Sequence, residues 1–271
     1  MLRATWHGHS TVLLELDGVR LLTDPVVRAR LLHLRRVVGE ADVRTLADVD
    51  AVLVSHLHYD HLDIPSLQSL GRSLRVVAPA GARRLLRRSG FDDVAELDVG
   101  ETLEVGAVTI RATPAEHKGR RSPFAKAATI GFLVEGSARV FFAGDTDLFD
   151  GMRAIAPELD LALLPVAGWG PRVPAGHLDP LRAAQALVLL RPRLAVPIHW
   201  GTYRRIGLAR DPATLRAPAE SFLRHARELA PGVDVRLLPV GGMLELGPGS
   251  SALEDAPPGA RPEARTTRRE E

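Results

Sequence analysis

Apolar residues recur along the first part of the chain in short runs of the kind that form β-strands. Residues 11–16 and 19–23 make two such runs, and Asp17-Gly18 between them is a strong signal for a hairpin turn. Residues 51–55 are apolar as far as the final serine, which is typical of a strand buried on both faces. The chain is therefore expected to start with a hairpin and continue into a buried strand.

The same pattern predicts strands and helices over the rest of the chain. Further strands are predicted at residues 75–78, 108–113, 130–135, 139–143, 161–165 and 194–198. Helical periodicity falls at about residues 64–71, 80–90, 179–191 and 216–230. We interpret the arginine-rich residues 28–48 as a loop with a helical turn. Runs of strands, with helices between and after them, favour two sheets covered by helices on the outside.

The character of the chain changes near Gly247, after which proline, glycine, serine, arginine and glutamate dominate. Such a composition cannot bury enough apolar surface to fold. We therefore expect one folded domain at residues 1–247 and a disordered tail without chemistry at residues 248–271.

Composition restricts the class of protein. Hydrophobic residues make up 45% of the 271 residues and charged residues 25%, as in ordinary globular domains. The formal net charge is only +2, and acidic residues are interspersed with the arginines. Because steering of nucleic acid needs a concentrated basic patch, nucleic acid is not the expected substrate.

The absence of cysteine excludes disulfides and thiolate ligands, so any metal must be held by histidine and carboxylate. No apolar run approaches the roughly 20 residues that a membrane-spanning helix needs. Residues 1–10 contain two histidines and lack the apolar centre of a signal peptide. A cytoplasmic location is expected, and the sequence allows an oligomer.

The segment Ser55-His56-Leu57-His58-Tyr59-Asp60-His61 carries the strongest chemical signal. It directly follows a predicted buried strand, where alternate side chains of extended backbone share a face. Zinc and similar metals accept imidazole nitrogen and carboxylate oxygen at about 2.0–2.2 Å. The alternative is a solvated histidine-rich loop, which does not suit three histidines and an aspartate directly after a buried strand.

Partners for these residues occur further along, each just after a predicted strand. His117 follows residues 108–113, Asp145 follows residues 139–143, and His199 follows residues 194–198. Any one of them alone would more often be structural. Their common position at strand ends indicates that they join the histidine loop in one site.

The ordered set His-x-His-x-Asp-His, then His, Asp and His, resembles the metallo-β-lactamase superfamily over residues 1 to about 246. The resemblance implies an α/β fold, a four-layer αββα sandwich of two mixed sheets flanked by helices. It also implies two divalent metal ions, most commonly zinc, with manganese or iron as alternatives. By position, the implied ligands of one metal are His56, His58 and His117, those of the other are Asp60, His61 and His199, and Asp145 bridges them.

Four further strings are closest to the branch of N-acyl-phosphatidylethanolamine phospholipase D-like and ascorbate-6-phosphate lactonase-like proteins. They are Trp6-His7-Gly8-His9-Ser10-Thr11, Leu22-Thr23-Asp24-Pro25, Gly176-His177-Leu178-Asp179-Pro180 and Pro197-Ile198-His199-Trp200-Gly201-Thr202. This resemblance implies a hydrolase whose nucleophile is a hydroxide bridging two metals. A phosphodiester, lactone or ester is the implied substrate, on a small or lipid-like molecule.

Two alternative functions stay open. A non-catalytic metal-binding or regulatory protein could use the same scaffold, although the complete ligand set argues against it. A nuclease-type phosphodiesterase is the other, but only 53 residues separate Asp145 from His199, too few for the large cap domain common in such nucleases.

Five residues are expected to have roles besides that of a simple ligand. Asp60 is expected to orient the attacking water as well as bind metal. His177, which the resemblance places at the rim of the site, is expected to stabilise charge or protonate a leaving group, with a helix-capping or surface histidine as the alternative. Asp24 would accept a hydrogen bond from a ligand histidine, with a simple turn residue as the alternative. His9 either supports the site or packs structurally. Trp169 is expected in the substrate wall because its indole offers apolar area, with a packed loop as the alternative.

Overall fold

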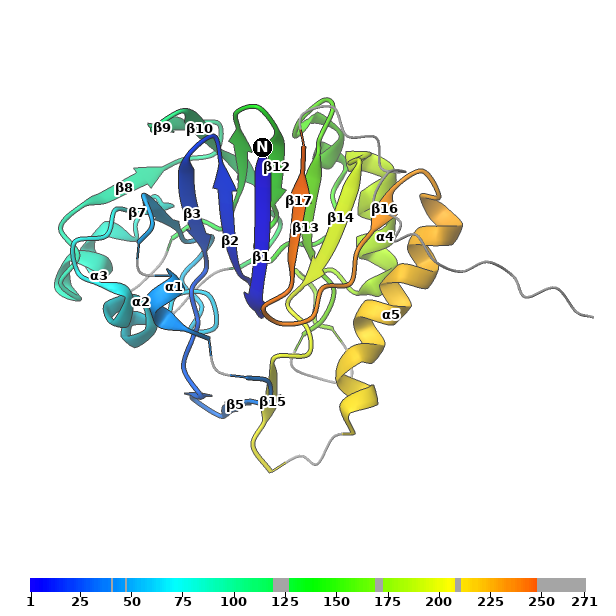
Figure 1. Ribbon diagram of the computed structural model, residues 1–271, viewed down its shortest axis with the longest axis horizontal. Coiled ribbons are helices and arrows are strands. Elements are labelled where there is room, and N and C mark those ends of the chain that lie inside the picture. The colour runs from blue at the N-terminus through cyan, green and yellow to red at the C-terminus, as the bar shows by residue number, and fades with distance from the viewer. Residues whose placement is uncertain (40, 47, 119–126, 169–172, 208–210, 248–271) are drawn as a thin grey trace, which may run out of the picture.

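The computed structural model describes residues 1–39, 41–46, 48–118, 127–168, 173–207 and 211–247. Two seven-stranded sheets face one another at its centre, with helices on both outer sides (Figure 1). The predicted tail at residues 248–271 and the predicted substrate-wall residue Trp169 lie outside the described residues.

The first sheet is mixed, because its antiparallel N-terminal strands continue into parallel ones. Its strands, in spatial order, are β17 (Met243–Leu246), β1 (Leu2–Gly8), β2 (Thr11–Leu16), β3 (Val19–Thr23), β6 (Ala51–Leu53), β7 (Val76–Pro79) and β8 (Val94–Leu97).

The second sheet has the same mixed character, with parallel strands at one end and antiparallel strands at the other. Its strands, in spatial order, are β16 (Asp234–Val235), β14 (Leu194–Ile198), β13 (Leu161–Pro165), β12 (Arg139–Phe142), β11 (Ile130–Glu135), β10 (Val108–Pro114) and β9 (Thr102–Val105).

Helices complete the four layers. On the first sheet lie α1 (Val43–Leu46), α2 (Ile64–Leu70) and α3 (Arg83–Arg88), whose leucines pack with the sheet's outer face. On the second sheet lie α4 (Pro180–Leu190) and α5 (Pro212–Leu229), and a short 3₁₀ turn covers Asp150–Ala154. This arrangement confirms the αββα sandwich predicted from the sequence. Within the described residues, no helix combines the length and apolar character needed to cross a lipid bilayer.

The predicted starts of two helices have a visible local cause. Asp63 and Asp179 precede α2 and α4, and each carboxylate accepts a backbone N–H of the first turn, from Ser66 and Arg182 respectively. Proline in the first turn of each helix costs no hydrogen bond, because that N–H has no partner within the helix. The helix predicted from residue 216 begins earlier, at Pro212, again after an aspartate cap.

Several short strands were not predicted. Residues 2–8 form β1, with every second side chain buried. The arginine-rich stretch 28–48 contains the expected helical turn α1, but also β4 (Arg30–Leu31) and β5 (Leu34–Arg36). These two pair with β15 (Tyr203–Arg205) to form a small third sheet, at the lower edge of the molecule in Figure 1. The interpretation of this stretch as a loop was wrong there, because strands so short carry no readable alternation.

The site forms at the edge of the sandwich where the parallel strands of both sheets end. β3 and β6 are parallel in the first sheet, and β12, β13 and β14 are parallel in the second. The segments that follow these strands carry the predicted site residues, and they meet at one edge of the sandwich, above the small sheet. A stacked pair of indoles, Trp6 and Trp200 with centroids 5.0 Å apart, closes the core beneath this edge.

Candidate metal centre

The loop after β6 supplies four of the site's side chains. His56 and His61 are completely buried, whereas His58 and Asp60 are partly exposed. The chain turns at this point, because the backbone N–H groups of His61 and Leu62 both donate to the carbonyl of His58. That turn sends His58 toward one side of the site and Asp60 toward the other.

Three histidines form the first cluster: His56, His58 and His117. His117 follows β10 and reaches the histidine loop, so that its Nε2 lies 3.1 Å from Nδ1 of His58. The rings of His56 and His117 meet edge to face, with centroids 4.7 Å apart. One potential ligand atom from each residue lies within 4.8 Å of the others, a spacing that suits a shared ion.

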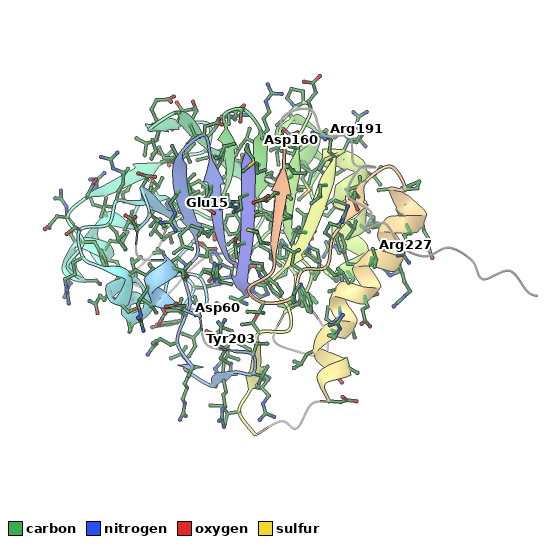
Figure 2. All side chains as sticks on the ribbon, in the orientation of Figure 1. Glu15, Asp60, Asp160, Arg191, Tyr203 and Arg227 are labelled. Carbon is green, nitrogen blue, oxygen red and sulfur yellow. The ribbon has the colours of Figure 1, made fainter. Side chains whose placement is uncertain are left out.

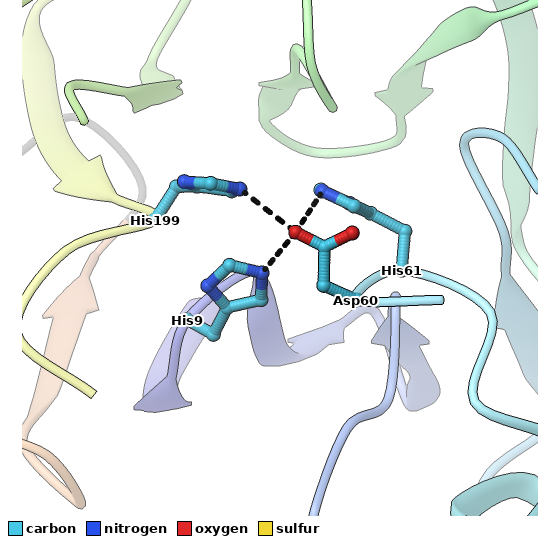
Figure 3. Close-up of side chains that lie close together, drawn as sticks. All are labelled: His9, Asp60, His61 and His199. Carbon is cyan, nitrogen blue, oxygen red and sulfur yellow. Dashed lines mark ion pairs between the residues drawn. The ribbon is translucent and has the colours of Figure 1, made fainter. Parts of the chain in front are cut away.

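The second cluster consists of His9, Asp60, His61 and His199, again with ligand atoms within 4.8 Å of one another. Figure 3 shows three imidazoles converging on one carboxylate oxygen, Oδ2 of Asp60. That oxygen lies 3.5 Å from Nε2 of His9, 3.9 Å from Nε2 of His61 and 3.6 Å from Nε2 of His199. His9, predicted either to support the site or to pack structurally, thus lies as close to Asp60 as the predicted ligand His199 does.

Asp145 lies between the two clusters. Its Oδ2 is 4.0 Å from Nε2 of His56 in the first cluster and 3.1 Å from Nε2 of His61 in the second. Its other oxygen, Oδ1, is 3.5 Å from Nε2 of His199. The carboxylate therefore faces both clusters at once, as a bridging ligand would.

Hydrogen bonds on the far side of two imidazoles, those of His117 and His56, decide which ring nitrogen faces the centre. His117 Nδ1 lies 2.7 Å from the carbonyl of Gly176, which can only accept, so this nitrogen carries the proton. Ser55 Oγ donates to Asp24 at 2.6 Å and so accepts from His56 Nδ1 at 3.0 Å. In each ring the Nε2 lone pair is left to face the centre.

Asp24 sits behind the cluster, completely buried after β3. Its Oδ1 accepts the backbone N–H of Ser55 at 2.7 Å, and its Oδ2 accepts both Ser55 Oγ and His61 Nδ1, the latter at 2.7 Å. Asp24, His9 and His199 all have positive φ, at 31°, 51° and 63°. Strained backbone of this kind clusters at functional sites, because the surrounding packing must hold it in place.

The electrostatics of the pocket suit a cation. Burial alone raises the pKa of Asp60 and Asp145, but the neighbouring histidines hold both pKa values well below the ordinary range. Burial lowers the pKa of His61, yet the carboxylates of Asp145, Asp24 and Asp60 raise it well above its usual value. Three carboxylates thus create a field that holds positive charge at this position.

Other imidazoles of the site are kept neutral. Burial lowers the pKa of His117 to about 4 and that of His9 to about 3, so both present uncharged nitrogen at neutral pH. Nε2 of His56, Nε2 of His61 and Oδ1 of Asp145 are buried and make no hydrogen bond. Buried polar atoms without partners are costly, and metal ions would coordinate all three. The chemistry of these residues therefore fits divalent metal.

His177 lies at the exposed rim of the first cluster. Its ring meets that of His117 with centroids 4.5 Å apart, and its Nε2 is 3.4 Å from Asp145 Oδ2. Burial lowers the pKa of His177, but the Asp145 carboxylate more than offsets this and raises it. His177 is thus the predicted residue best placed to carry a proton at the mouth of the site. By contrast, His33 is exposed on the small sheet and His225 lies on α5.

Asp147 holds the loop that carries His177, a role the sequence gave no reason to assign. Its Oδ2 accepts the backbone N–H of Gly176 at 3.0 Å, and its Oδ1 pairs with Arg182 of α4. Ser55 and Thr202 were missed as well; Thr202 Oγ1 accepts the backbone N–H of His9 at 2.6 Å. These residues act through contacts between distant segments, and only their position beside predicted ligands could have drawn attention to them.

Comparisons with known proteins identify the family of the chain. A family model described as a β-lactamase superfamily domain matches residues 19–200, more than half of the chain. A metal-dependent hydrolase of family UPF0173 from Methanopyrus kandleri is 31% identical over 259 residues, which are 90% of this chain and 100% of the relative.

Two further relatives extend the comparison. An N-acyl-phosphatidylethanolamine-hydrolyzing phospholipase D of Caenorhabditis elegans is 34% identical over 228 residues, 74% of this chain but only 64% of that enzyme. The chain thus spans less than two thirds of the worm enzyme's length. A novel metallo hydrolase of Ignicoccus hospitalis shares the fold, with a TM-score of 0.70 at 24% identity over 91% of this chain and 99% of the other. These findings confirm the predicted resemblance: the chain belongs to the metallo-β-lactamase superfamily of metal-dependent hydrolases.

Proposed function

We propose that the protein is a dinuclear hydrolase that cleaves a phosphodiester, lactone or ester bond. The observation that carries this proposal is the position of Asp145, whose carboxylate faces two separate clusters of histidines. In the proposed arrangement His56, His58 and His117 hold one ion, Asp60, His61 and His199 hold the other, and Asp145 is shared.

Histidine and carboxylate ligands without thiolate suit zinc, and they also accept manganese or iron. Divalent ions at such a site supply Lewis acidity, which lowers the pKa of water and polarises a carbonyl or phosphoryl oxygen. The remaining tasks, positioning and proton transfer, belong to residues of the chain.

Asp60 and His177 carry those tasks. The Asp60 carboxylate accepts a hydrogen bond from the attacking water and so orients it toward the substrate. His177 lies at the partly exposed rim, with its Nε2 3.4 Å from Asp145 Oδ2, where it could meet a departing group, and its raised pKa favours the protonated ring. Donation of that proton to the leaving oxygen would complete the cleavage.

The substrate class is supported by the relatives rather than by the metal site itself. One of these relatives is named as a phospholipase D that hydrolyses N-acyl-phosphatidylethanolamine. This name favours a phosphodiester substrate on a small or lipid-like molecule. Nucleic acid is disfavoured, because acidic residues alternate with the arginines over most of the chain.

The test is metal content per chain, measured together with hydrolysis of bis(p-nitrophenyl) phosphate and of a simple lactone. We expect two ions per chain and turnover of at least one substrate, with both lost in His58→Ala. Asp211→Asn, in the helix cap of α5, is the matched control and should behave as wild type. Two ions without turnover on a broad panel of esters, lactones and phosphodiesters would instead indicate a metal-binding protein without catalysis.

A further inference from the structure

His9 lies in the two-residue turn between β1 and β2, where the backbone is left-handed. Its φ is 51°, and that of the preceding Gly8 is 100°. A side chain clashes with its own backbone in this conformation, which is therefore uncommon for residues other than glycine. The fold thus places a histidine where glycine would cost less, and the surrounding packing must hold it there.

The loop after β14 holds this turn in place. The backbone N–H of His9 donates to Thr202 Oγ1 at 2.6 Å, and its carbonyl accepts the backbone N–H of His199 at 2.9 Å. The same carbonyl accepts the indole N–H of Trp6 at 2.8 Å. A methyl group on Gly8 would lie only 2.8 Å from Thr202 Cγ2, so the two segments are in close contact. The backbone that carries the imidazole is therefore fixed at both its N–H and its carbonyl.

The ring of His9 is buried and packs between two other rings. Its centroid lies 4.0 Å from that of His199 and 5.8 Å from that of Tyr203, which it meets edge to face. Tyr203 lies below Asp60 in the view of Figure 2, and its hydroxyl donates to the carbonyl of Arg28 at 2.8 Å. This packing restricts rotation of the imidazole, so the fold determines the direction in which its Nε2 points.

Nε2 of His9 points toward the carboxylate of Asp60. It lies 3.5 Å from Oδ2, at the long limit of a hydrogen bond. A carboxylate oxygen can only accept, so a neutral imidazole that faces one carries its proton on the facing nitrogen. The ring is neutral at neutral pH, because burial lowers the pKa of His9 to about 3. The geometry therefore places the single ring proton of His9 on Nε2, directed at Asp60.

His9 approaches Asp60 from a different side than the other histidines of the second cluster. Nε2 of His61 and of His199 also lie near the second carboxylate, at 3.1 and 3.5 Å from oxygens of Asp145. These two imidazoles therefore border the space between the carboxylates, where an ion would have ligands on every side. In Figure 3 they lie above Oδ2 of Asp60, and His9 lies below it. His9 thus supports the carboxylate from the side away from that space.

We propose that His9 is a positioning residue, which donates its Nε2–H to Oδ2 of Asp60 and so fixes the orientation of that carboxylate. The inference rests on the proposed function, in which Asp60 binds metal and orients the attacking water. Outer hydrogen bonds orient the groups that bind a metal, and carboxylate ligands commonly receive them. Asp24 supports the predicted ligand His61 in this way, and His9 supports Asp60.

NMR of the full-length protein with ¹⁵N-labelled histidine tests the assignment directly. The chemical shift of an imidazole nitrogen separates a protonated nitrogen from a bare one and from one bound to metal. Comparison with His9→Gln identifies the signals of His9. We expect a protonated Nε2 in both the zinc-loaded and the metal-stripped protein, and a shift of its proton in Asp60→Asn. A bare Nε2, or one bound to zinc, would overturn the proposal.

His9→Gln and His9→Met form a matched pair of variants. Both side chains are unbranched and of similar length, and both carry the same backbone strain at this turn, but only glutamine offers an N–H donor. We expect metal affinity to fall by about 10–100-fold in His9→Met and to stay close to wild type in His9→Gln. Competition against a chromophoric chelator measures it. An equal loss in both variants, or no loss in either, would overturn the proposal, because the hydrogen bond would then be irrelevant.

Cobalt provides a signature that a purely structural role would not change. The visible absorption of protein-bound Co²⁺ depends on the geometry of its ligands, so a reoriented Asp60 should alter the spectrum. We expect an altered spectrum at unchanged cobalt content in His9→Met, and the wild-type spectrum in His9→Gln. His7→Gln, two residues earlier on β1, removes an imidazole outside the cluster and is the control. Loss of one cobalt ion per chain in both His9 variants would overturn the proposal and make His9 a ligand.

Kinetics separates failure of this inference from failure of the proposed function. At saturating metal, His9→Met should lower kcat by about 10–100-fold at unchanged KM, and His9→Gln should restore it. Wild-type kcat in His9→Met would refute the positioning role alone. Absence of turnover by the wild-type protein on every ester, lactone and phosphodiester would refute the hydrolase. The NMR result on metal-stripped protein would then still decide whether His9 donates to Asp60.

Discussion

Asp24 Oδ2 lies 2.7 Å from His61 Nδ1, and both side chains are completely buried. The same carboxylate accepts two hydrogen bonds from Ser55, whose hydroxyl in turn holds His56. One residue from the end of β3 therefore orients a histidine in each of the two clusters. The sequence suggested this role for Asp24 only by resemblance, with a turn residue as the alternative.

Asp24→Asn is expected to weaken metal binding without unfolding the protein. Asparagine keeps the shape but replaces one acceptor oxygen by an NH₂ group, which cannot accept from His61 and Ser55. Loss of such an outer hydrogen bond lowers metal affinity by about 10–100-fold. Competition against a chromophoric chelator measures the affinity, with Asp211→Asn as the control. Wild-type affinity in Asp24→Asn would show that Asp24 is only a turn residue.

His177→Ala is expected to retain both metals and lose rate. The ring lies 3.4 Å from Asp145 but at the exposed rim, so its removal leaves the inner ligands in place. Loss of a proton donor or of charge stabilisation lowers kcat by roughly 10²–10³-fold. Steady-state kinetics and metal analysis on the same sample make the comparison, and His225→Ala on α5 controls for loss of an imidazole. Unchanged kcat in His177→Ala would remove this residue from the mechanism.

The grouping of the candidate ligand residues was predictable because each one follows a strand whose apolar run is easy to recognise. Residues 51–55 and 194–198 are typical of buried strands and residues 139–143 of a strand, and parallel strands of a sheet end at the same edge. The αββα layering followed from the same runs. His9 was harder to interpret, because the strand before it, β1, alternates buried and half-buried residues over a stretch that also contains arginine and histidine.

The small third sheet could not be predicted for a different reason. Two of its strands, Arg30–Leu31 and Leu34–Arg36, are too short to show a period, and arginine is not a strand-forming signal. They pair because β15, nearly 170 residues further on, lies alongside them. Asp147 could not be predicted for the same reason. Its role depends on contacts with Gly176 and Arg182, which are distant in the sequence and are not indicated by any local pattern.

Removal of metal is expected to lower the thermal stability of the protein. Without a cation, the buried carboxylates of Asp24 and Asp145 lie close to that of the partly exposed Asp60, and the buried Nε2 of His56 has no hydrogen-bond partner. An ion that binds only the folded state stabilises by about 2.7 kcal/mol when present at 100 times its dissociation constant. Calorimetry before and after chelation should show a lower Tm that returns when zinc is restored. An unchanged Tm would mean that these residues do not bind metal in the folded protein.

Gly144→Ala is expected to lower both stability and metal affinity by displacing a residue that supports the metal ligands. Gly144 immediately precedes Asp145 and has a φ of +59°. A methyl group there would lie 2.6 Å from Cβ and 2.8 Å from Oγ of Ser55, the residue that links Asp24 to His56. Backbone strain together with displacement of Ser55 should cost about 1–3 kcal/mol of unfolding free energy, and metal affinity should fall with it.

Gly232→Ala is the matched control for this substitution, because no atom lies within 4 Å of its added methyl group and its φ is not positive. Denaturant unfolding measures stability, and metal competition measures affinity. If Gly144→Ala lost stability but bound metal as tightly as wild type, Ser55 could not be the link through which Asp24 orients His56. Loss of both quantities together, with Gly232→Ala unaffected, would tie the packing behind Asp145 directly to the metal centre.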